Sequence, residues 1–379
     1  LMSGTSMDGI DLALIETDGE SLVRPLAFAS TGYDEPYRQR LRQAMAAARG
    51  LGDRRDRPGI VAAVEREITE LHAAAVASMR AEPQFAGPID VIGFHGQTVL
   101  HRPRPAAGET RLTLQLGDGA ALARATGIAV VHDLRAADFA AGGEGAPLVP
   151  VYHRALAARI GERPLAFLNI GGVANVTLVE GDGRLTACGT GPGNALIDDW
   201  VLRHTGARYD SRGALARTGT VDQQVLADLL AHSYFDQPAP KSLDRDAFAV
   251  PERIGRSVAD GAATLSEFTV RAVARVVDVL PALPRRWIVC GGGRHNQLLM
   301  ERLAAVVAAP VIASDAIGVD GDATEAEAWA YLAVRSLKGL PITFPGTTGV
   351  ARSMPGGIHS GRSPAAPAGG IKNGPRGAT

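Results

Sequence analysis

The same strand–bend–strand pattern occurs twice in this sequence, about half a chain apart. Residues 1–19 pass from a bend of small and hydroxyl residues into an apolar strand and end in Glu-Thr-Asp-Gly. Residues 165–183 form a strand, a bend of Asn, Gly and Ala, and a second strand that ends in Glu-Gly-Asp-Gly. Such a repeat predicts a duplicated architecture, with one unit opening each of two domains. Two bends that face one another would also suit the binding of a polyphosphate.

A glycine-rich turn follows the second unit. The stretch ACGTGPGNALIDDW, residues 187–200, predicts a strand, a turn and a helix with Asn194 as its N-cap. The stretch WIVCGGGRHNQLLMERL, residues 287–303, has the same plan. Such turns let backbone N–H groups and a helix N-terminus approach an anionic ligand. A single turn of this kind is a weak signal and can be purely structural, but its recurrence favours a ligand site.

Length and charge limit the possible classes of protein. A chain of 379 residues usually divides into two domains. A formal net charge of −1 gives no field that would attract nucleic acid or an anionic membrane, and no apolar run is long enough to span a bilayer. Cys188 and Cys290 form no metal-type pair, and residues 1–11 show no signal-peptide pattern. We therefore expect a cytoplasmic protein without nucleic-acid or membrane partners.

Polar residues at strand ends are candidates for ligand contacts. The hydroxyls of Thr5 and Ser6 could cradle phosphate and Asp8 could hold a metal, although Asp-Gly is also a common hairpin turn. His95 begins a polar His-Gly-Gln-Thr run at the end of a predicted strand, where open α/β sheets bind ligands. A purely structural histidine is an equal alternative there.

A second polar cluster lies further along the chain. Arg135 and Asp138 precede a glycine loop and could grip a polar substrate, or they could form a salt-bridged connection. The remaining histidines at 101, 132 and 153 have no partner at metal-ligand spacing, so we expect no zinc site.

The rest of the chain reads as mostly helical connections and a tail. Residues 35–85 and 203–280 have helical spacing. Residues 323–334 predict a helix whose charges are solvated, apart from one that faces the cleft; it carries Glu325 and Glu327. Residues 360–379 are rich in Gly, Pro and Ala, and we expect them to be disordered.

An ordered set of motifs resembles the anhydro-N-acetylmuramic acid kinase family. The motifs are MSGTSMDGID, GFHGQT, DLRAADFAAGGEGAPLVP, NIGGVANVT, GPGNALIDDW, PKS and CGGGRHN. The resemblance implies an α/β fold of the actin, hexokinase and Hsp70 superfamily, with two ribonuclease-H-like domains and an interdomain nucleotide cleft. The expected domains are residues 1–135, with part of 340–358 packing back, and residues 136–340, followed by the tail at 360–379.

The resemblance also implies an activity. The family uses ATP to open 1,6-anhydro-N-acetylmuramic acid with water and to phosphorylate O6, giving N-acetylmuramic acid 6-phosphate and ADP in peptidoglycan recycling. Mg²⁺ is expected with the nucleotide, with Asp8 as its candidate protein contact, and the family forms homodimers.

The implied site residues fall into three groups. The phosphate and nucleotide contacts are Gly4, Thr5, Ser6, Met7, Asp8, Gly9, Ile10, Asp11, Asn169, Gly171, Gly172, Asn175, Gly291, Gly292 and Gly293. The substrate contacts are His95, Gly96, Gln97, Thr98, Arg135, Asp138, Gly191, Gly193 and Asn194. The implied catalytic residue is Glu325, together with the position now held by Gly189.

Gly189 is a departure from the family pattern. The family places an aspartate there, as the base that takes a proton from the attacking water, and glycine has no side chain. Loss of a general base commonly lowers a rate by about 10²–10⁴-fold. Asp138, Asp198, Asp199 or Glu325 could replace it only from within hydrogen-bond reach. The alternatives are a catalytically inactive ATP- and amino-sugar-binding protein, or a kinase for an ordinary hexosamine.

Overall fold

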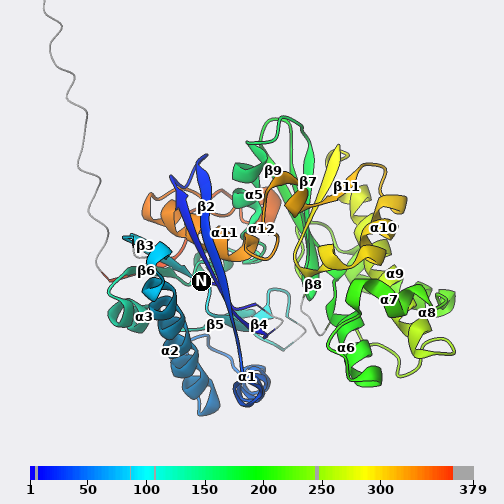
Figure 1. Cartoon of the computed structure of the whole chain (residues 1–379), viewed down its shortest axis with the longest axis horizontal. Coiled ribbons are helices and arrows are strands. Elements are labelled where there is room, and N and C mark those ends of the chain that lie inside the picture. The colour runs from blue at the N-terminus through cyan, green and yellow to red at the C-terminus, as the bar shows by residue number, and fades with distance from the viewer. Residues whose placement is uncertain (5–6, 86, 106–107, 244–246, 362–379) are drawn as a thin grey trace, which may run out of the picture.

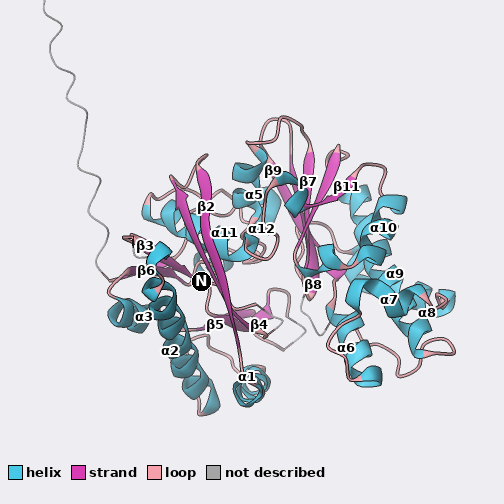
Figure 2. Ribbon diagram, viewed as in Figure 1, coloured by secondary structure: helices cyan, strands magenta, loops and turns pink. Residues whose placement is uncertain are grey.

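The computed structural model describes residues 1–4, 7–85, 87–105, 108–243 and 247–361. Its helices and strands form two lobes that lie side by side (Figure 1). We define the first lobe by the strands β1 to β6 and β12, and the second lobe by the sheet of β7 to β11. Helices surround both sets of strands (Figure 2). The expected Thr5 and Ser6 contacts and most of the expected tail lie outside the described residues.

The second lobe contains one five-stranded sheet. Its strands are β7 (Leu165–Ile170), β8 (Val173–Val179), β9 (Leu185–Pro192), β10 (Arg286–Cys290) and β11 (Val311–Ala313). Their order is β11-β10-β7-β8-β9. β8 pairs antiparallel with both β7 and β9, whereas β10 runs parallel to β7 and β11 runs parallel to β10. This is the order and direction of a ribonuclease-H-like sheet, which confirms the expected fold class.

The first lobe repeats part of this plan in separate pieces. Its strands are β1 (Gly9–Thr17), β2 (Val23–Gly32), β3 (Val91–Phe94), β4 (Gln97–Arg102), β5 (Leu112–Leu116), β6 (Ala129–His132) and β12 (Ile358–Ser360). β1 pairs antiparallel with β2, β3 pairs parallel with β6, and β12 pairs antiparallel with β6. β4 and β5 form a separate hairpin.

Residues 1–3 join these pieces. Met2 pairs with Asp11 of β1, the Leu1 amino group donates to the Gly93 carbonyl (2.7 Å), and His95 N–H donates to the Leu1 carbonyl (3.1 Å). The short segment therefore lies between β1 and β3, as β7 lies between β8 and β10. The predicted repeat is confirmed.

The helices follow the predicted spacing. They are α1 (Glu35–Ala48), α2 (Ile60–Ala81), α3 (Gly119–Thr126), α4 (Ala136–Ala140), α5 (Pro150–Ala157), α6 (Ala195–Thr205), α7 (Ala214–Arg217), α8 (Gln223–Leu230), α9 (Val258–Val276), α10 (Gln297–Val306), α11 (Thr324–Leu337) and α12 (Pro345–Thr348). The expectation of helices within 35–85 and 203–280 is confirmed.

Helix α11 crosses from one lobe to the other. It follows the last strand of the second lobe but packs against β1 and β3 of the first. One hydrophobic cluster contains residues of both lobes, including Val131, Phe167 and Trp329, so the lobes share a core. The domain boundaries stay a proposal, and this packing favours placing α11 with the first lobe.

The charges of α11 differ from the prediction. Glu327 is 2% exposed and accepts a hydrogen bond from the Tyr152 hydroxyl, and Glu325 is also largely enclosed. The expectation of solvated charges was wrong for Glu327 because the helix is covered on both sides by the two lobes.

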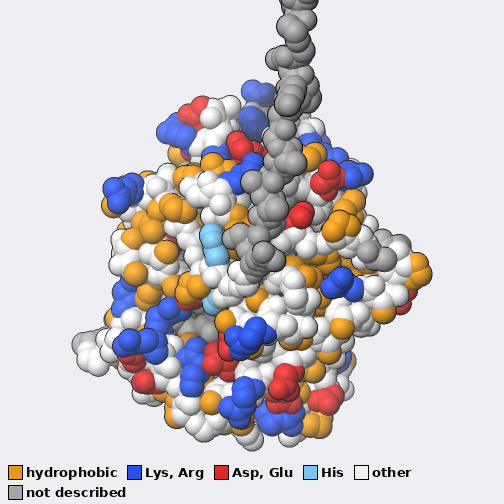
Figure 3. All heavy atoms as spheres, turned by 90° about the vertical axis from the view of Figure 1, so that its left-hand side faces the viewer, with side chains coloured by type: hydrophobic (Ala, Val, Ile, Leu, Met, Phe, Trp, Pro, Cys, Tyr) orange, Lys and Arg blue, Asp and Glu red, His pale blue; other side chains and the backbone are white. Residues whose placement is uncertain are grey.

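The described residues on one face of the molecule form no large area of one charge (Figure 3). On the face formed by the left-hand side of Figure 1, basic and acidic side chains are interspersed (Figure 3). Within the described residues, no helix is both long and apolar enough to span a membrane.

Candidate functional site

The first bend is tied to the start of β4. Ser3 Oγ donates to Gln97 Oε1 (2.7 Å), and Gln97 Nε2 donates to the Gly4 carbonyl (3.1 Å). Gln97 has no exposed surface, so it positions the bend at Gly4. Met7 has a positive φ of 55° and donates its N–H to the Gly4 carbonyl (3.2 Å), which closes the bend. Of the other predicted contacts, Gly9 and Ile10 begin β1.

His95 and Arg135 meet beside Trp329. Arg135 Nη2 donates to His95 Nε2 (3.2 Å) and Nη1 donates to the Gly145 carbonyl (2.9 Å). Trp329 packs against both side chains. Burial, aided by the charge of Arg135, lowers the pKa of His95 to about 3, so the imidazole is neutral. A neutral His95 and a charged Arg135 form a rigid polar wall at the junction of the lobes.

Asp138 is part of the framework around this wall. It is 1% exposed, and its two carboxylate oxygens accept hydrogen bonds from the Gly145 N–H (2.8 Å) and the Thr348 hydroxyl (2.6 Å). Through these two hydrogen bonds Asp138 holds the glycine loop against α12. Thr98, also predicted as a contact, accepts a long hydrogen bond from Gln115 (3.4 Å).

Glu325 meets the second bend. Asn169 Nδ2 donates to Glu325 Oε1 (2.9 Å), which joins α11 to the end of β7. Burial raises the pKa of Glu325 above its ordinary value, the charge of Arg135 opposes that rise, and Asp11 and Asp8 add to it. Burial and the charges of Asp8 and Asp322 likewise raise the pKa of Asp11, against a hydrogen bond from Ser30. Carboxylates of the first bend thus gather near an amide of the second.

The glycine turn before α6 differs from the prediction. Its N–H groups at Gly193, Asn194 and Ala195 donate to the carbonyls of Gly171 and Gly172 at 2.7–3.2 Å. The Asn194 side chain does not cap α6 but donates to the Ile170 carbonyl (3.1 Å). Asn194 therefore holds the predicted N-cap position of α6, but its side chain is bound to the second bend and makes no capping hydrogen bond.

The three consecutive glycines after β10 pack closely against that bend. Gly291 has a φ of 73°, and a Cβ there would collide with the Asn169 side chain. A Cβ at Gly293 would collide with Ile170, whereas Gly292 is exposed and has space around it. Gly292 is therefore the member of the three that a nucleotide can approach.

Gly189 lies in a row of positions across the sheet. Asn169 on β7 is opposite Asn175 on β8, which is opposite Gly189 on β9, with a bulge before Gly191. Neighbouring strands lie about 4.8 Å apart, so the backbone of Gly189 lies about 10 Å from that of Asn169. Glu325 is hydrogen-bonded to Asn169, at the other end of this row.

Tyr234 fills the space next to Gly189. A Cβ at position 189 would lie closer than 3.0 Å to the Tyr234 hydroxyl oxygen. Tyr234 is 3% exposed, and its hydroxyl has no hydrogen-bond partner among the described residues. Gly189 N–H donates to the Lys241 carbonyl (2.7 Å), and Lys241 Nζ donates to the Tyr234 carbonyl (2.9 Å). The segment 234–241 thus closes over Gly189.

The chain matches one protein family over nearly its whole length. The model of the anhydro-N-acetylmuramic acid kinase family matches residues 1–359. The anhydro-N-acetylmuramic acid kinase of Rhizorhabdus wittichii is 55% identical over 360 residues, covering 94% of this chain and 97% of that protein. The chain belongs to the anhydro-N-acetylmuramic acid kinase family. It is therefore an ATP-dependent sugar kinase by family.

A second relative and one solved structure are also similar to this chain. The anhydro-N-acetylmuramic acid kinase of Nitrobacter winogradskyi is 53% identical over 365 residues, covering 94% of this chain and 97% of that protein. A ROK family glucokinase from Streptomyces griseus, solved with glucose and AMPPNP, is 14% identical with a TM-score of 0.37, covering 84% of this chain and 95% of that one.

Sequence reasoning missed two residues of this kinase. Trp329 packs against His95 and Arg135. It follows Glu325 by one helical turn, and this spacing is the sequence signal that could have identified it. Tyr234 lies in an irregular segment, and nothing in its local sequence places it beside Gly189.

Proposed function

We propose that this chain opens 1,6-anhydro-N-acetylmuramic acid with water and transfers the γ-phosphoryl group of ATP to O6, and that water activation is weakened at Gly189. The hydrogen bond between Asn169 and Glu325 supports this proposal most directly, because it brings a buried carboxylate from α11 to the second bend. The family match names the substrate class.

The proposed reaction needs one proton acceptor. Water oxygen bonds to the anomeric carbon, the bond from that carbon to O6 breaks, and O6 displaces ADP from the γ-phosphorus. The water proton leaves to a carboxylate. Glu325 is the candidate, because burial raises its pKa above the ordinary value and Asn169 orients it. We expect a lower rate, because Glu325 is bound to Asn169 at the opposite end of the row from position 189.

The remaining residues position the substrates. Arg135 and His95 offer a cation and a neutral imidazole to the sugar, and Asp138 with Gln97 fixes the loops that carry them. The bends at Gly4 and Asn169 suit the phosphates, with Gly292 at the nucleoside.

The first bend fits Mg²⁺. Asp8 lies close enough to Asp11 for its charge to raise the pKa of Asp11, and Mg²⁺ commonly binds one or two carboxylates, several waters and the substrate phosphates. Within the described residues no three His, Cys, Asp or Glu side chains form a protein-only metal site, which agrees with that mode. Bound there, the ion would neutralise charge on the phosphates.

The test is sugar-dependent ADP formation. Purified protein, ATP and Mg²⁺ are assayed with 1,6-anhydro-N-acetylmuramic acid, with N-acetylglucosamine and without sugar, and the product is identified by mass. We expect N-acetylmuramic acid 6-phosphate from the anhydro sugar alone. ADP formed only with N-acetylglucosamine would replace this proposal by a hexosamine kinase.

The closure of Tyr234 over Gly189 favours a second candidate, a sugar- and ATP-binding protein without turnover. Calorimetric binding of both ligands with no ADP formed would establish it.

A further inference from the structure

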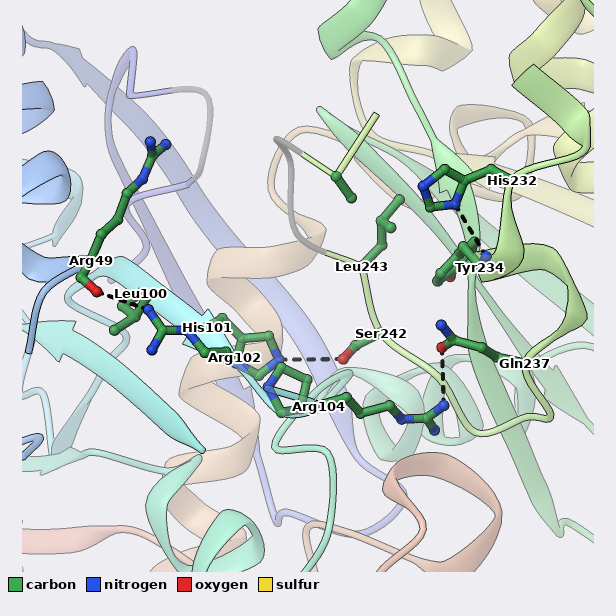
Figure 4. A pocket seen from close by; sticks show the side chains of 12 residues that line it. Arg49, Leu100, His101, Arg102, Arg104, His232, Tyr234, Gln237, Ser242 and Leu243 are labelled. Atoms are coloured by element: carbon green, nitrogen blue, oxygen red, sulfur yellow. Dashed lines mark hydrogen bonds between the residues drawn. The ribbon is translucent and has the colours of Figure 1, made fainter. Parts of the chain in front are cut away.

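A cavity of about 420 Å³ lies at the junction of the lobes, beside the segment that covers Gly189 (Figure 4). One wall comes from the end of α1 and from strand β4, and the other comes from the segment that follows α8. Its volume suits a small ligand or one substituent of a larger ligand. The lining residues are Arg49, Leu100, His101, Arg102, Pro103, Arg104, His232, Tyr234, Gln237, Ser242, Leu243 and Ala247.

The lining of this cavity is cationic. Three of its twelve described residues are arginines and none is Asp or Glu. Arg102 donates to two neutral carbonyls, Arg49 O (2.9 Å) and Thr110 O (3.5 Å). Its Nε lies 3.7 Å from the carboxylate of Glu109, whose side chain is 46% exposed. Its positive charge is therefore only weakly compensated.

The neighbouring cation Arg104 has a different role. Its Nε pairs with Glu144 (2.8 Å), and its other nitrogens donate to the Gln237 side chain (3.0 Å) and the Pro240 carbonyl (2.8 Å) of the opposite wall. Arg104 therefore holds the walls together, and Arg102 is the cation that remains for a ligand.

His101 is a neutral side chain between the walls. Its Nε2 lies 3.4 Å from Ser242 Oγ, and burial, aided by the charges of Arg135 and Arg111, lowers its pKa to about 3. His101 therefore adds no charge to the lining, and the arginines determine its sign. A planar carboxylate matches the guanidinium of Arg102 in shape and charge.

We propose that this cavity binds a carboxylate group, with Arg102 as its cationic contact. The carboxylate has two sources: the acidic substituent of the acceptor sugar, which rests on the proposed function, or a separate small organic acid, which does not.

The experiment compares two sugars that differ by that substituent. Calorimetry measures 1,6-anhydro-N-acetylmuramic acid and 1,6-anhydro-N-acetylglucosamine binding to the whole chain and to Arg102→Gln, without ATP. D-Lactate is titrated separately as a free carboxylate. Arg38→Gln is the control, because Arg38 is 18% exposed against 17% for Arg102 and also lies 3.7 Å from a glutamate, but is outside the cavity.

If the sugar supplies the carboxylate, Arg102→Gln lowers the affinity for the acidic sugar about 10- to 100-fold and leaves the affinity for the neutral sugar unchanged. If a separate acid binds, both sugars are unchanged and the variant loses D-lactate binding that the wild type shows. Two results overturn the proposal. One is an equal loss of affinity for both sugars, and the other is unchanged affinity for both sugars with no binding of D-lactate to the wild type. Because these titrations need no turnover, absence of ADP formation would remove the proposed function and leave this result standing.

Discussion

The two strand–bend–strand units occupy equivalent places in their lobes but differ in charge. In the first unit Asp11 lies opposite Met2, and Asp8 precedes it in the bend. In the second unit Asn175 lies opposite Asn169, so both polar positions are neutral amides. Carboxylates suit a divalent cation, whereas amides donate to phosphate oxygens without repulsion. The difference supports our proposal of a metal at the first unit and of phosphate contacts at the second.

Glu325 connects the two units, so its removal has the largest expected effect. Glu325→Gln keeps the shape but removes the proton acceptor, and we expect the rate of ADP formation to fall about 10²–10⁴-fold. Glu327→Gln is the matched control on the same helix, since Glu327 faces Tyr152 instead. Equal activity of Glu325→Gln and the wild type would exclude Glu325 as the base.

Asp11→Asn makes the first unit resemble the second. We expect the Mg²⁺ concentration for half-maximal rate to rise about tenfold, because one anionic oxygen donor near the ion is lost. A Mg²⁺ titration of the rate measures this, with Asp18→Asn at the far end of the same hairpin as the control. An unchanged Mg²⁺ requirement would mean that the charge difference between the units does not select the metal.

Gly189→Ala tests how tightly Tyr234 packs against Gly189. The new Cβ meets the Tyr234 hydroxyl, so we expect a loss of about 1–3 kcal/mol in the free energy of unfolding. Adding Tyr234→Phe to the Gly189→Ala variant should recover much of the lost free energy of unfolding. Gly181→Ala, where a Cβ meets nothing within 4 Å, should change the value by less than about 0.5 kcal/mol. Equal effects at 181 and 189 would contradict this packing. Urea unfolding supplies all four values.

The pH dependence of stability gives the smallest expected effect. The folded state binds the Glu325 proton more tightly than the unfolded state, because burial raises the pKa above the ordinary 4.5. The free energy of unfolding should therefore fall as the pH rises from about 4.5 through the raised pKa. Glu325→Gln should show a flatter profile over that range. Parallel profiles for the two proteins would show that the pKa of Glu325 is not raised.

The repeat and the helices could be predicted because they depend on local patterns. The equivalence of residues 1–19 and 165–183 was visible in strand-forming residues and their shared ending, and the strand pairing confirms it. The path of α11 could not be predicted, because its apolar face suits either lobe and only tertiary packing selects β1 and β3.

The candidate site was predicted residue by residue but not contact by contact. Asn194 holds the N-cap position expected for it, yet its side chain donates to the Ile170 carbonyl and does not cap the helix. The pairing of Gly189 with Tyr234 joins residues far apart in the chain, and neither carries a local signal for the other. Contacts of this kind depend on the fold, not on neighbouring residues in the sequence.

The most direct test is the rate of ADP formation from 1,6-anhydro-N-acetylmuramic acid by the wild type beside Gly189→Asp/Tyr234→Phe. The double variant supplies a carboxylate at the end of the row and removes the hydroxyl that would collide with it. We predict that it turns over about 10²–10⁴-fold faster than the wild type. Equal rates, with both proteins folded and binding sugar equally, would contradict the claim that Gly189 limits water activation.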